Sequence, residues 1–411
     1  MTLELTRRIS VTLGVLLVYR LGTYIPLPGI DPSVWDQIFR SQAVGTLGTF
    51  NMFFSGGAIR RMAIFALGII PYLSAAILLQ FLAIASARLR GLRRKGEYGR
   101  RIVDTYTYSL TILLAVFQSL GIAIGLEGVS NLVADPGWLF RISTVLTLTG
   151  GTMLLVWLSS QITARGIGNG VTLILFAGTV TEIPAVIAGI LELGQQGLLS
   201  SGLLLTLLVT TVALTALVVV VERARRRLPV VFQKPQGTQH WDLSVKLNNA
   251  GLMPTILASW ILTVPMLLAY VFAPDWVSWI ASRIASQLGE GRPLFFIVYA
   301  VLIVGCTFFY TAFVFDPDEG AENLKRHGAS FPGVPPGEVT AEYIDRVATR
   351  ITVIGAAYLA LIWLIPAAIT SSLIVPFYFA GTSLLIVVCA IIDLEDHIRG
   401  FASVKRGVRR P

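Results

Sequence analysis

The residues that could carry acid–base or nucleophilic chemistry are few and scattered in this sequence. The two cysteines, Cys306 and Cys389, fall inside apolar runs, where a thiol behaves as a small hydrophobic group. The three histidines lie in polar segments and have no partner at metal-ligand spacing: His240, His327 and His397. The sequence therefore predicts no catalytic residue, no disulfide, no metal site and no cofactor.

Motifs that would supply energy or cut covalent bonds do not occur either. The chain has no GxxxxGK[ST] phosphate-binding loop and no HExxH zinc motif. Ionisable residues in the apolar segments lie near segment ends, where anchoring at a membrane interface explains them: Arg20, Arg141, Glu182 and Asp393. We therefore expect neither an enzyme nor a transporter driven by protons or sodium. A partner would have to supply the energy.

Composition indicates a polytopic membrane protein. Of the 411 residues 55% are hydrophobic and 13% are charged, whereas about 25% charged is usual in soluble domains. The mean hydropathy is +0.74. The net charge of +9 could suggest a nucleic-acid binder, but Lys and Arg gather in alternate loops, as the positive-inside rule predicts. The charge therefore mainly reports topology.

The hydropathy pattern predicts about ten membrane spans, since a span needs roughly 20 apolar residues. They are 9–26, 62–87, 102–126, 138–161, 171–190, 198–221, 249–272, 294–315, 347–366 and 373–394. Basic residues place the loops 88–101, 222–248 and 316–346 and the tail 395–411 in the cytoplasm. An even number of spans then leaves both termini cytoplasmic.

The span count also suggests how the chain is divided. Residues 1–197 would hold five spans and residues 198–394 the other five. Five is odd, so two similar halves would be oppositely oriented, as in inverted repeats that place a pathway at their interface. No repeated motif is visible, and this inference rests on the arithmetic. The predicted fold is an all-α polytopic membrane protein with two inverted five-helix halves around a central pore.

One apolar stretch, Phe50 to Leu82, is interrupted. Its first part contains Ser55, Gly56 and Gly57 and then two arginines, so it cannot cross a membrane by itself. Irregular backbone at membrane depth survives only where protein buries it or where it lines a water-filled cavity. We therefore expect this segment inside a pathway. Two neutral polar residues, Gln80 and Asn248, could mark the same pathway or form ordinary hydrogen bonds between helices.

Several long blocks of this sequence resemble the SecY family, which forms the channel subunit of the bacterial Sec protein translocase. They include FNMFFSGGAIRRMAIFALGIIPYLSAAILLQFL, ITARGIGNGVTLILFAG, YTAFVFDP, AENLKRHG and VPFYFAGTSLLIVV. The resemblance runs in order from about Arg7 to Asp393. It implies two five-helix halves hinged around an hourglass pore in the cytoplasmic membrane.

The resemblance also implies roles for particular residues. The family's constricting ring falls on six branched aliphatic residues: Ile69, Leu73, Val171, Leu175, Ile256 and Ile386. Its plug falls on roughly 50–60, with Phe50, Asn51, Met52, Phe53, Phe54, Ser55, Gly56 and Gly57 at its core. Gln80 and Asn248 match polar positions of the lateral gate. A ring of methyl groups excludes water and ions yet deforms around a passing chain.

Partners follow from the resemblance as well. Basic residues in two cytosolic loops match the protrusions that dock the ribosome or the SecA motor: Arg225, Arg226, Arg227, Lys325 and Arg326. Small membrane subunits similar to SecE and SecG, signal peptides, nascent chains and the lipid bilayer are the other implied partners. Pro335 stands where the family has an arginine, which puts the distribution of docking contacts in doubt.

The expected function is a protein-conducting channel that moves unfolded secretory proteins across the membrane and releases apolar segments sideways into lipid. Two alternatives remain at this stage. One is a divergent accessory member of the family that serves a restricted set of substrates. The other is a small-solute secondary transporter with inverted repeats, which would need an ion or substrate site near the midplane.

Overall fold

The computed structural model describes residues 2–42, 55–93, 96–197, 199–234, 237–259, 261, 293–314, 317–371 and 381–405. These residues form two compact units, each with its own internal contacts. The N-terminal unit contains residues 2–201 and 389–405, and the C-terminal unit contains residues 202–371 and 381–388. The helix α15 (Gly381–Lys405) is thus shared between them.

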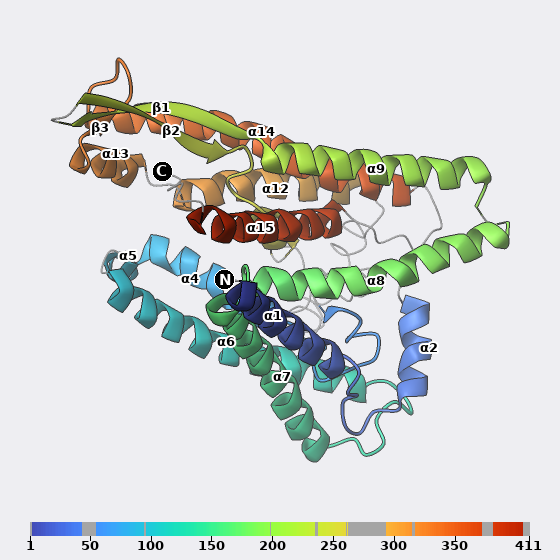
Figure 1. The fold of residues 1–411 in the computed structure, drawn as a ribbon. Helices are drawn as coiled ribbons and strands as arrows, with labels where there is room; N and C mark the ends of the chain where they lie inside the picture. The colour runs from blue at the N-terminus through green and yellow to red at the C-terminus, as the bar shows by residue number, and fades with distance from the viewer. Residues whose placement is uncertain are drawn as a thin grey trace. The chain divides into compact units, whose positions relative to one another are not determined.

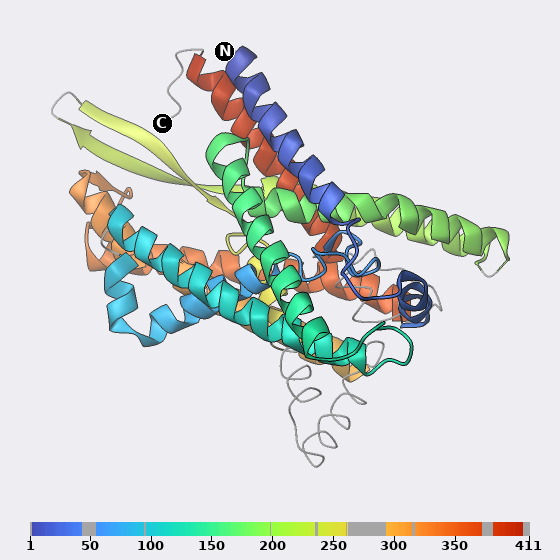
Figure 2. The ribbon, with the colours of Figure 1, turned by 90° about the horizontal axis from the view of Figure 1, so that it is seen from below.

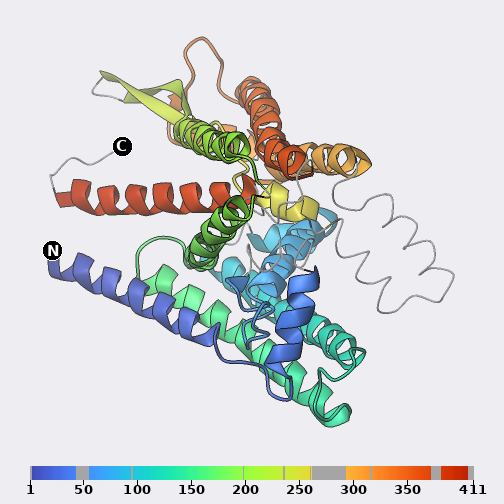
Figure 3. The ribbon, with the colours of Figure 1, turned by 90° about the vertical axis from the view of Figure 1, so that its right-hand side faces the viewer.

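The N-terminal unit is a bundle built around two long helices. Its helices are α1 (Thr2–Gly22), α2 (Pro32–Gln42), α4 (Ile70–Ala85), α5 (Ala87–Arg93), α6 (Gly96–Glu127), α7 (Trp138–Arg165) and α8 (Gly170–Gln195). The helix α7 packs against α6, α1 and α8, and α4 packs on α6 (Figures 1 and 3). The predicted spans 102–126, 138–161 and 171–190 lie within α6, α7 and α8.

Packing of α6 shows why these helices suit a membrane. Its buried face is a stripe of small residues four apart, namely Thr107, Thr111, Ala115, Ser119 and Ala123. Small residues let helix backbones approach closely, which drives helix association where lipid removes the hydrophobic effect. On α6 large apolar side chains lie on the outer surface instead, and Leu113 is 65% exposed. Six helices of the described residues are long and apolar enough to span a membrane: α6, α7, α8, α9, α14 and the segment that begins with α12.

The second span is shorter than the sequence predicts. A helix was expected from residue 62, but α4 begins at Ile70, and residues 55–69 form turns. Backbone pairing with the segment after α1 takes the place of helical bonds, since Leu27 N donates to Met62 O at 2.8 Å and Ile64 N donates to Ile25 O at 3.0 Å. Protein groups therefore satisfy irregular backbone, as burial in a membrane protein requires.

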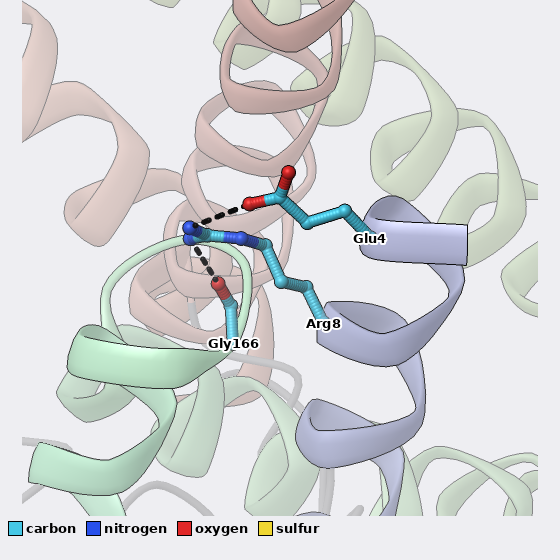
Figure 4. A network of polar contacts seen from close by, with 3 residues as sticks. All are labelled: Glu4, Arg8 and Gly166. Carbon is cyan, nitrogen blue, oxygen red and sulfur yellow. Dashed lines mark hydrogen bonds and ion pairs between the residues drawn. The ribbon is translucent and has the colours of Figure 1, made fainter. Parts of the chain in front are cut away.

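Segments predicted on the same side of the membrane lie together in this unit. Arg8, near the start of α1, donates to Gly166 O in the turn between α7 and α8 at 3.5 Å, and also contacts Glu4 (Figure 4). At the opposite ends of the helices, Asp31 N donates to Leu132 O at 2.9 Å. With a cytoplasmic N-terminus and the predicted order of spans, the first pair of segments falls on the cytoplasmic side and the second pair on the outer side.

The C-terminal unit combines helices with a small sheet. Its elements are α9 (Ser201–Arg223), β1 (Arg225–Lys234), β2 (Gly237–Lys246), α12 (Pro293–Val314), α13 (Pro317–Arg326), β3 (Ala329–Ser330), α14 (Glu338–Ser371) and the start of α15. The strands are antiparallel in the order β2-β1-β3, and the long hairpin β1–β2 is visible in Figure 2. The helices α12 and α13 both pack on α14.

The described residues of the two loops that the sequence predicts to be cytosolic, 222–248 and 316–346, belong to this sheet and its helices. Residues from both loops share one apolar core that includes Leu228, Val230, Phe331 and Ile344. The helix α14 begins at Glu338, inside the second predicted loop, and α15 continues through Lys405 into the predicted tail. The predicted span 249–272 is described only at residues 249–259 and 261.

Candidate functional site

The glycine pair Gly56 and Gly57 forms a buried turn at the start of the broken segment. Both residues have left-handed backbone, with φ of +57° and +84°. A Cβ on Gly56 would overlap Tyr19 Oη and lie 2.8 Å from Gly178 Cα, which belongs to α8. Left-handed φ favours glycine, so both conformation and space demand it here. The other predicted plug residues, Phe50 to Phe54, lie outside the described residues.

Two arginines hold the carbonyl groups of this turn. Arg20 Nη1 donates to Gly56 O at 3.0 Å, and Arg20 Nη2 donates to Tyr24 Oη at 2.8 Å. Arg61 Nη1 donates to Gly57 O at 3.4 Å. Both guanidinium groups lie over the Tyr24 ring, at 4.7 and 4.1 Å from its centroid, a favourable arrangement for a cation and an aromatic face. The turn is thus tied to the end of α1.

A tyrosine and a glutamate complete the surroundings of the glycine pair. Tyr19 is buried, its ring stacks on Phe65 at 6.1 Å, and its hydroxyl has no hydrogen-bond partner among the described residues. The Glu182 carboxylate lies against Gly57, where a Cβ would overlap it. The sequence indicates Arg20 and Glu182 only as interfacial anchors. The sequence shows only that these two charged residues stand in apolar segments. It does not show that α1 and α8 both reach the turn at Gly56 and Gly57.

The predicted constriction residues of the N-terminal unit stand at the starts of two helices. Ile69 immediately precedes α4, and Leu73 N donates to Ile69 O at 3.1 Å. Val171 and Leu175 lie in the first turns of α8. Each pair is four residues apart and so shares one helix face. Ile69, Leu73 and Leu175 are buried and Val171 is half-buried.

The other two predicted constriction residues, Ile256 and Ile386, belong to the C-terminal unit and are buried. The ring that would join the residues of both units stays a prediction.

The start of α8 is fixed by a cap and by close packing. Asn169 Oδ1 accepts from Val171 N at 3.0 Å and from Thr172 N at 3.4 Å, and so satisfies two free donors of the first turn. Gly170 N donates to Thr163 Oγ1 at 2.9 Å. A Cβ on Gly170 would overlap the backbone of Ser159. The GIGNG motif therefore fixes the start of α8, which carries Val171 and Leu175, against α7.

The two predicted gate residues have different surroundings. Gln80 lies on α4 of the N-terminal unit and is half-buried. Asn248, in the C-terminal unit, is only 3% exposed. Its Nδ2 donates to Glu222 Oε1 at 2.7 Å and to Gly251 O at 3.3 Å, and its Oδ1 accepts from Gly251 N at 3.0 Å. Its amide is thus committed to partners inside its own unit.

The predicted docking residues all lie on the sheet and helix formed by the two loops. Arg225, Arg226 and Arg227 begin β1 and are exposed. Lys325 and Arg326 end α13 and are exposed too, and Arg326 pairs with Glu322 at 2.6 Å. Exposed pairs of this kind contribute only about 0.3–0.5 kcal/mol. Pro335 lies exposed in the turn before α14, where its carbonyl accepts from Thr340 Oγ1 at 2.8 Å.

Apolar helices that are long enough to span a membrane, packed around a buried glycine turn, define a helical membrane protein. Solved structures of protein-conducting channels have the same fold as this chain. The structure described as "The structure of a protein conducting channel" matches with a TM-score of 0.71 and 16% identity, over 99% of this chain and 95% of that one. Sec61 in a canine ribosome–channel complex matches with a TM-score of 0.68 and 16% identity, over the same shares of the two chains.

Sequence comparison identifies the family. The SecY family model matches residues 63–394. The protein translocase subunit SecY of Escherichia coli K12 is 46% identical over 407 residues, which cover 96% of this chain and 91% of the relative. The Vibrio cholerae subunit is 44% identical with the same coverage. The chain belongs to the SecY family. It is a multi-pass protein of the cytoplasmic membrane and a channel subunit of a protein translocase, not an enzyme.

Proposed function

We propose that unfolded secretory proteins cross the membrane through this chain, and that apolar segments leave it sideways into lipid. The observation that carries the proposal is the 46% identity to a translocase subunit over 96% of the chain. The buried glycine turn adds structural support, because it gives the broken segment a specific seat between α1 and α8. A small-solute transporter would need a midplane binding site, whereas the sequence indicates that the ionisable residues of the predicted spans are interfacial anchors near span ends.

In this mechanism the six aliphatic residues, Ile69, Leu73, Val171, Leu175, Ile256 and Ile386, form the constriction. Methyl groups offer no hydrogen bonds to water or ions, so a narrow ring of them stays dry and closed. The plug, roughly residues 50–60, rests on the outer side of the constriction in the closed state. The turn at Gly56 and Gly57, in the second half of the plug, anchors it to α1.

The gate would lie between spans two and seven, which carry Gln80 and Asn248. We place residues 1–197 and 198–394 in the two halves of the channel, with both termini in the cytoplasm. The contacts of Arg8 with Gly166 and of Asp31 with Leu132 support this topology, because each joins segments assigned to one side of the membrane.

Energy would come from the SecA motor or from the ribosome, with SecE-like and SecG-like subunits beside the channel. The canine relative is described in a complex with a ribosome, and the exposed Arg225, Arg226, Arg227, Lys325 and Arg326 offer positive charge to such a partner. Arginines that neutralise RNA phosphates make binding weaken as salt rises. We expect the affinity for ribosomes to fall as the salt concentration rises. The fall should be steeper for the wild-type channel than for a variant in which the charge of Arg226 is removed.

Crosslinking tests the pore. The starting variant has Cys306 and Cys389 replaced by alanine, and a single cysteine is then introduced by Ile69→Cys or Ile256→Cys. The complex is reconstituted in proteoliposomes with SecA and ATP. Crosslinking of that cysteine to a stalled precursor that carries a crosslinker is measured. Leu139→Cys, at an exposed site on α7, is the matched control. We expect adducts at both pore positions, dependent on the signal sequence, and none at the control. Adducts confined to the cytosolic loops of an intact complex would refute the assignment.

A further inference from the structure

A cavity of about 500 Å³ lies beside the end of α1 in the N-terminal unit. Three segments line it: Tyr24 and Pro26 follow α1, Pro32 and Asp36 belong to α2, and Arg60 and Arg61 belong to the turns before α4. Its volume falls within the range of small-molecule sites, about 300–1,000 Å³. The proposed path of a secretory protein gives this cavity no role.

Hydrogen bonds between the three segments hold the walls of the cavity in place. Pro26 pairs with Ala63 in an antiparallel β-bridge, which joins the segment after α1 to the turns before α4. Trp35 of α2 is buried, and its Nε1 donates to Ile59 O at 2.8 Å, directly before Arg60. The cavity is therefore preformed, and a ligand that enters it has little protein entropy to overcome.

The charged side chains of the cavity carry both signs. The Arg61 guanidinium lies 4.1 Å from the centroid of the Tyr24 ring and donates to Gly57 O at 3.4 Å. A guanidinium has five N–H donors in a planar fork that fits a phosphate group. Arg60 Nε lies 3.8 Å from Asp36 Oδ1. A ligand with a phosphate and an ammonium group would thus find partners for both.

The neighbouring face of α1 points to a lipid as the source of that ligand. Leu13, Leu17 and Leu21 are each 60–61% exposed, and their spacing of four residues puts them on one helix face. Tyr24 follows one turn later, where its N–H donates to Leu21 O at 3.0 Å, and it is exposed at the cavity. The predicted span 9–26 ends here, and tyrosine is frequent at membrane interfaces. An acyl chain on this face would bring its head group to the cavity.

We propose that the cavity binds a phospholipid whose head group carries a primary ammonium, as in phosphatidylethanolamine. Arg60 and Arg61 would take the phosphate, and Asp36 the ammonium. The inference goes beyond the proposed function and takes from it only the topology, which puts this end of α1 on the outer side.

Asp36 sets the choice among phospholipids, because all of them carry the phosphate. The quaternary ammonium of phosphatidylcholine has no N–H to donate. The glycerol group of phosphatidylglycerol offers only neutral donors, and hydrogen bonds between ionised groups are about twice as strong as neutral ones. The cavity should therefore prefer phosphatidylethanolamine to both.

Competition for a photoreactive lipid tests the site. The purified complex in detergent is labelled with a phosphatidylethanolamine that carries a diazirine in its acyl chain, and adducts are mapped by mass spectrometry. We expect adducts at Leu17 and Leu21. Unlabelled phosphatidylethanolamine should displace the probe at about tenfold lower concentration than phosphatidylcholine or phosphatidylglycerol with the same chains. Inorganic phosphate should not displace it.

Charge-removing variants separate the two halves of the site. Asp36→Asn should abolish the preference for phosphatidylethanolamine over phosphatidylcholine and keep the binding of both. Arg61→Gln should weaken the binding of all three lipids about tenfold. The matched controls, Glu97→Gln and Arg100→Gln, change exposed charges at the start of α6 and should bind like wild type. A misfolded variant would lose every lipid alike, whereas loss of selectivity alone requires an intact cavity.

Several results would overturn the proposal. Adducts spread evenly over the apolar helices, or equal displacement by phosphatidylcholine, would show that the cavity does not select a head group. Stronger displacement by phosphatidylglycerol would show a site for anionic lipids instead, and displacement by inorganic phosphate would show a site for the free ion. Unchanged selectivity in Asp36→Asn would also refute it. Detergent removes the distinction between membrane faces, so these results do not depend on topology. Precursor export by the same complex in proteoliposomes is measured separately, and its failure would overturn the proposed function and not the lipid site.

Discussion

Replacing Gly56 by alanine should unseat the buried glycine turn and make the resting channel leak ions. A left-handed conformation costs a residue with a Cβ about 1–2 kcal/mol. The new Cβ would also lie 2.8 Å from Gly178 Cα, a backbone atom of α8 that cannot move aside without moving the helix. The seated state should thus lose at least ~2 kcal/mol, which shifts the balance towards the unseated state about 30-fold.

The assay is the conductance of the purified complex in planar bilayers without precursor, SecA or ribosomes. Gly189→Ala, on the same helix as Gly178, is the control, because nothing lies within 4 Å of a Cβ there. Adding Tyr19→Phe to Gly56→Ala removes one of the two overlaps and should restore part of the seal. Equal conductance of Gly56→Ala and Gly189→Ala complexes would show that the turn does not control the closed state.

Three further predictions concern local stability. Tyr19→Phe should raise the free energy of unfolding by about 1 kcal/mol, because the buried hydroxyl has no partner among the described residues; a lower thermal midpoint in detergent would contradict this. Asn169→Ala should lower the free energy of unfolding by ~1 kcal/mol through loss of the α8 cap, and an unchanged midpoint would show that the cap is dispensable. Hydrogen bonds from the Ser33 side chain and from the backbone of Ser33 and Val34 lower the pKa of Asp31. Its contribution to α2 is therefore present above the unfolded pKa of about 3.9 and is lost as pH falls through the folded pKa. Hydrogen exchange of α2 should show this acid sensitivity in wild type and not in Asp31→Asn.

Hydropathy predicts the long spans well because a helix that crosses lipid needs apolar side chains along its whole length. The predicted spans 102–126 and 138–161 lie inside α6 and α7. Both are longer than the roughly 20 residues that a span needs, and the helix ends follow from charge and from glycine, as at Gly166. These features are local in sequence, so no tertiary information is needed to find them.

The start of α4 could not be predicted in this way. Residues 62–69 are as apolar as the helix that follows them, yet their backbone pairs with Ile25 and Leu27. Composition reports what a side chain prefers and says nothing of which distant backbone supplies a hydrogen bond. The same limit applies to Tyr19 and Glu182, which reach the glycine turn from α1 and α8. Only folding brings these three segments together.

The two cytosolic loops contain an alternation of apolar residues that predicts strands. Their many basic residues drew attention to membrane topology instead. Leu228, Val230 and Phe232 alternate with outward residues in β1, as Trp241, Leu243 and Val245 do in β2, which is the period of a strand with one buried face. Their apolar face packs against residues of the second loop. The basic residues of both loops therefore stand on one structural piece with a shared core. Deleting either loop would expose the other's apolar face, so charge substitutions at the surface, rather than loop deletions, can separate docking from folding.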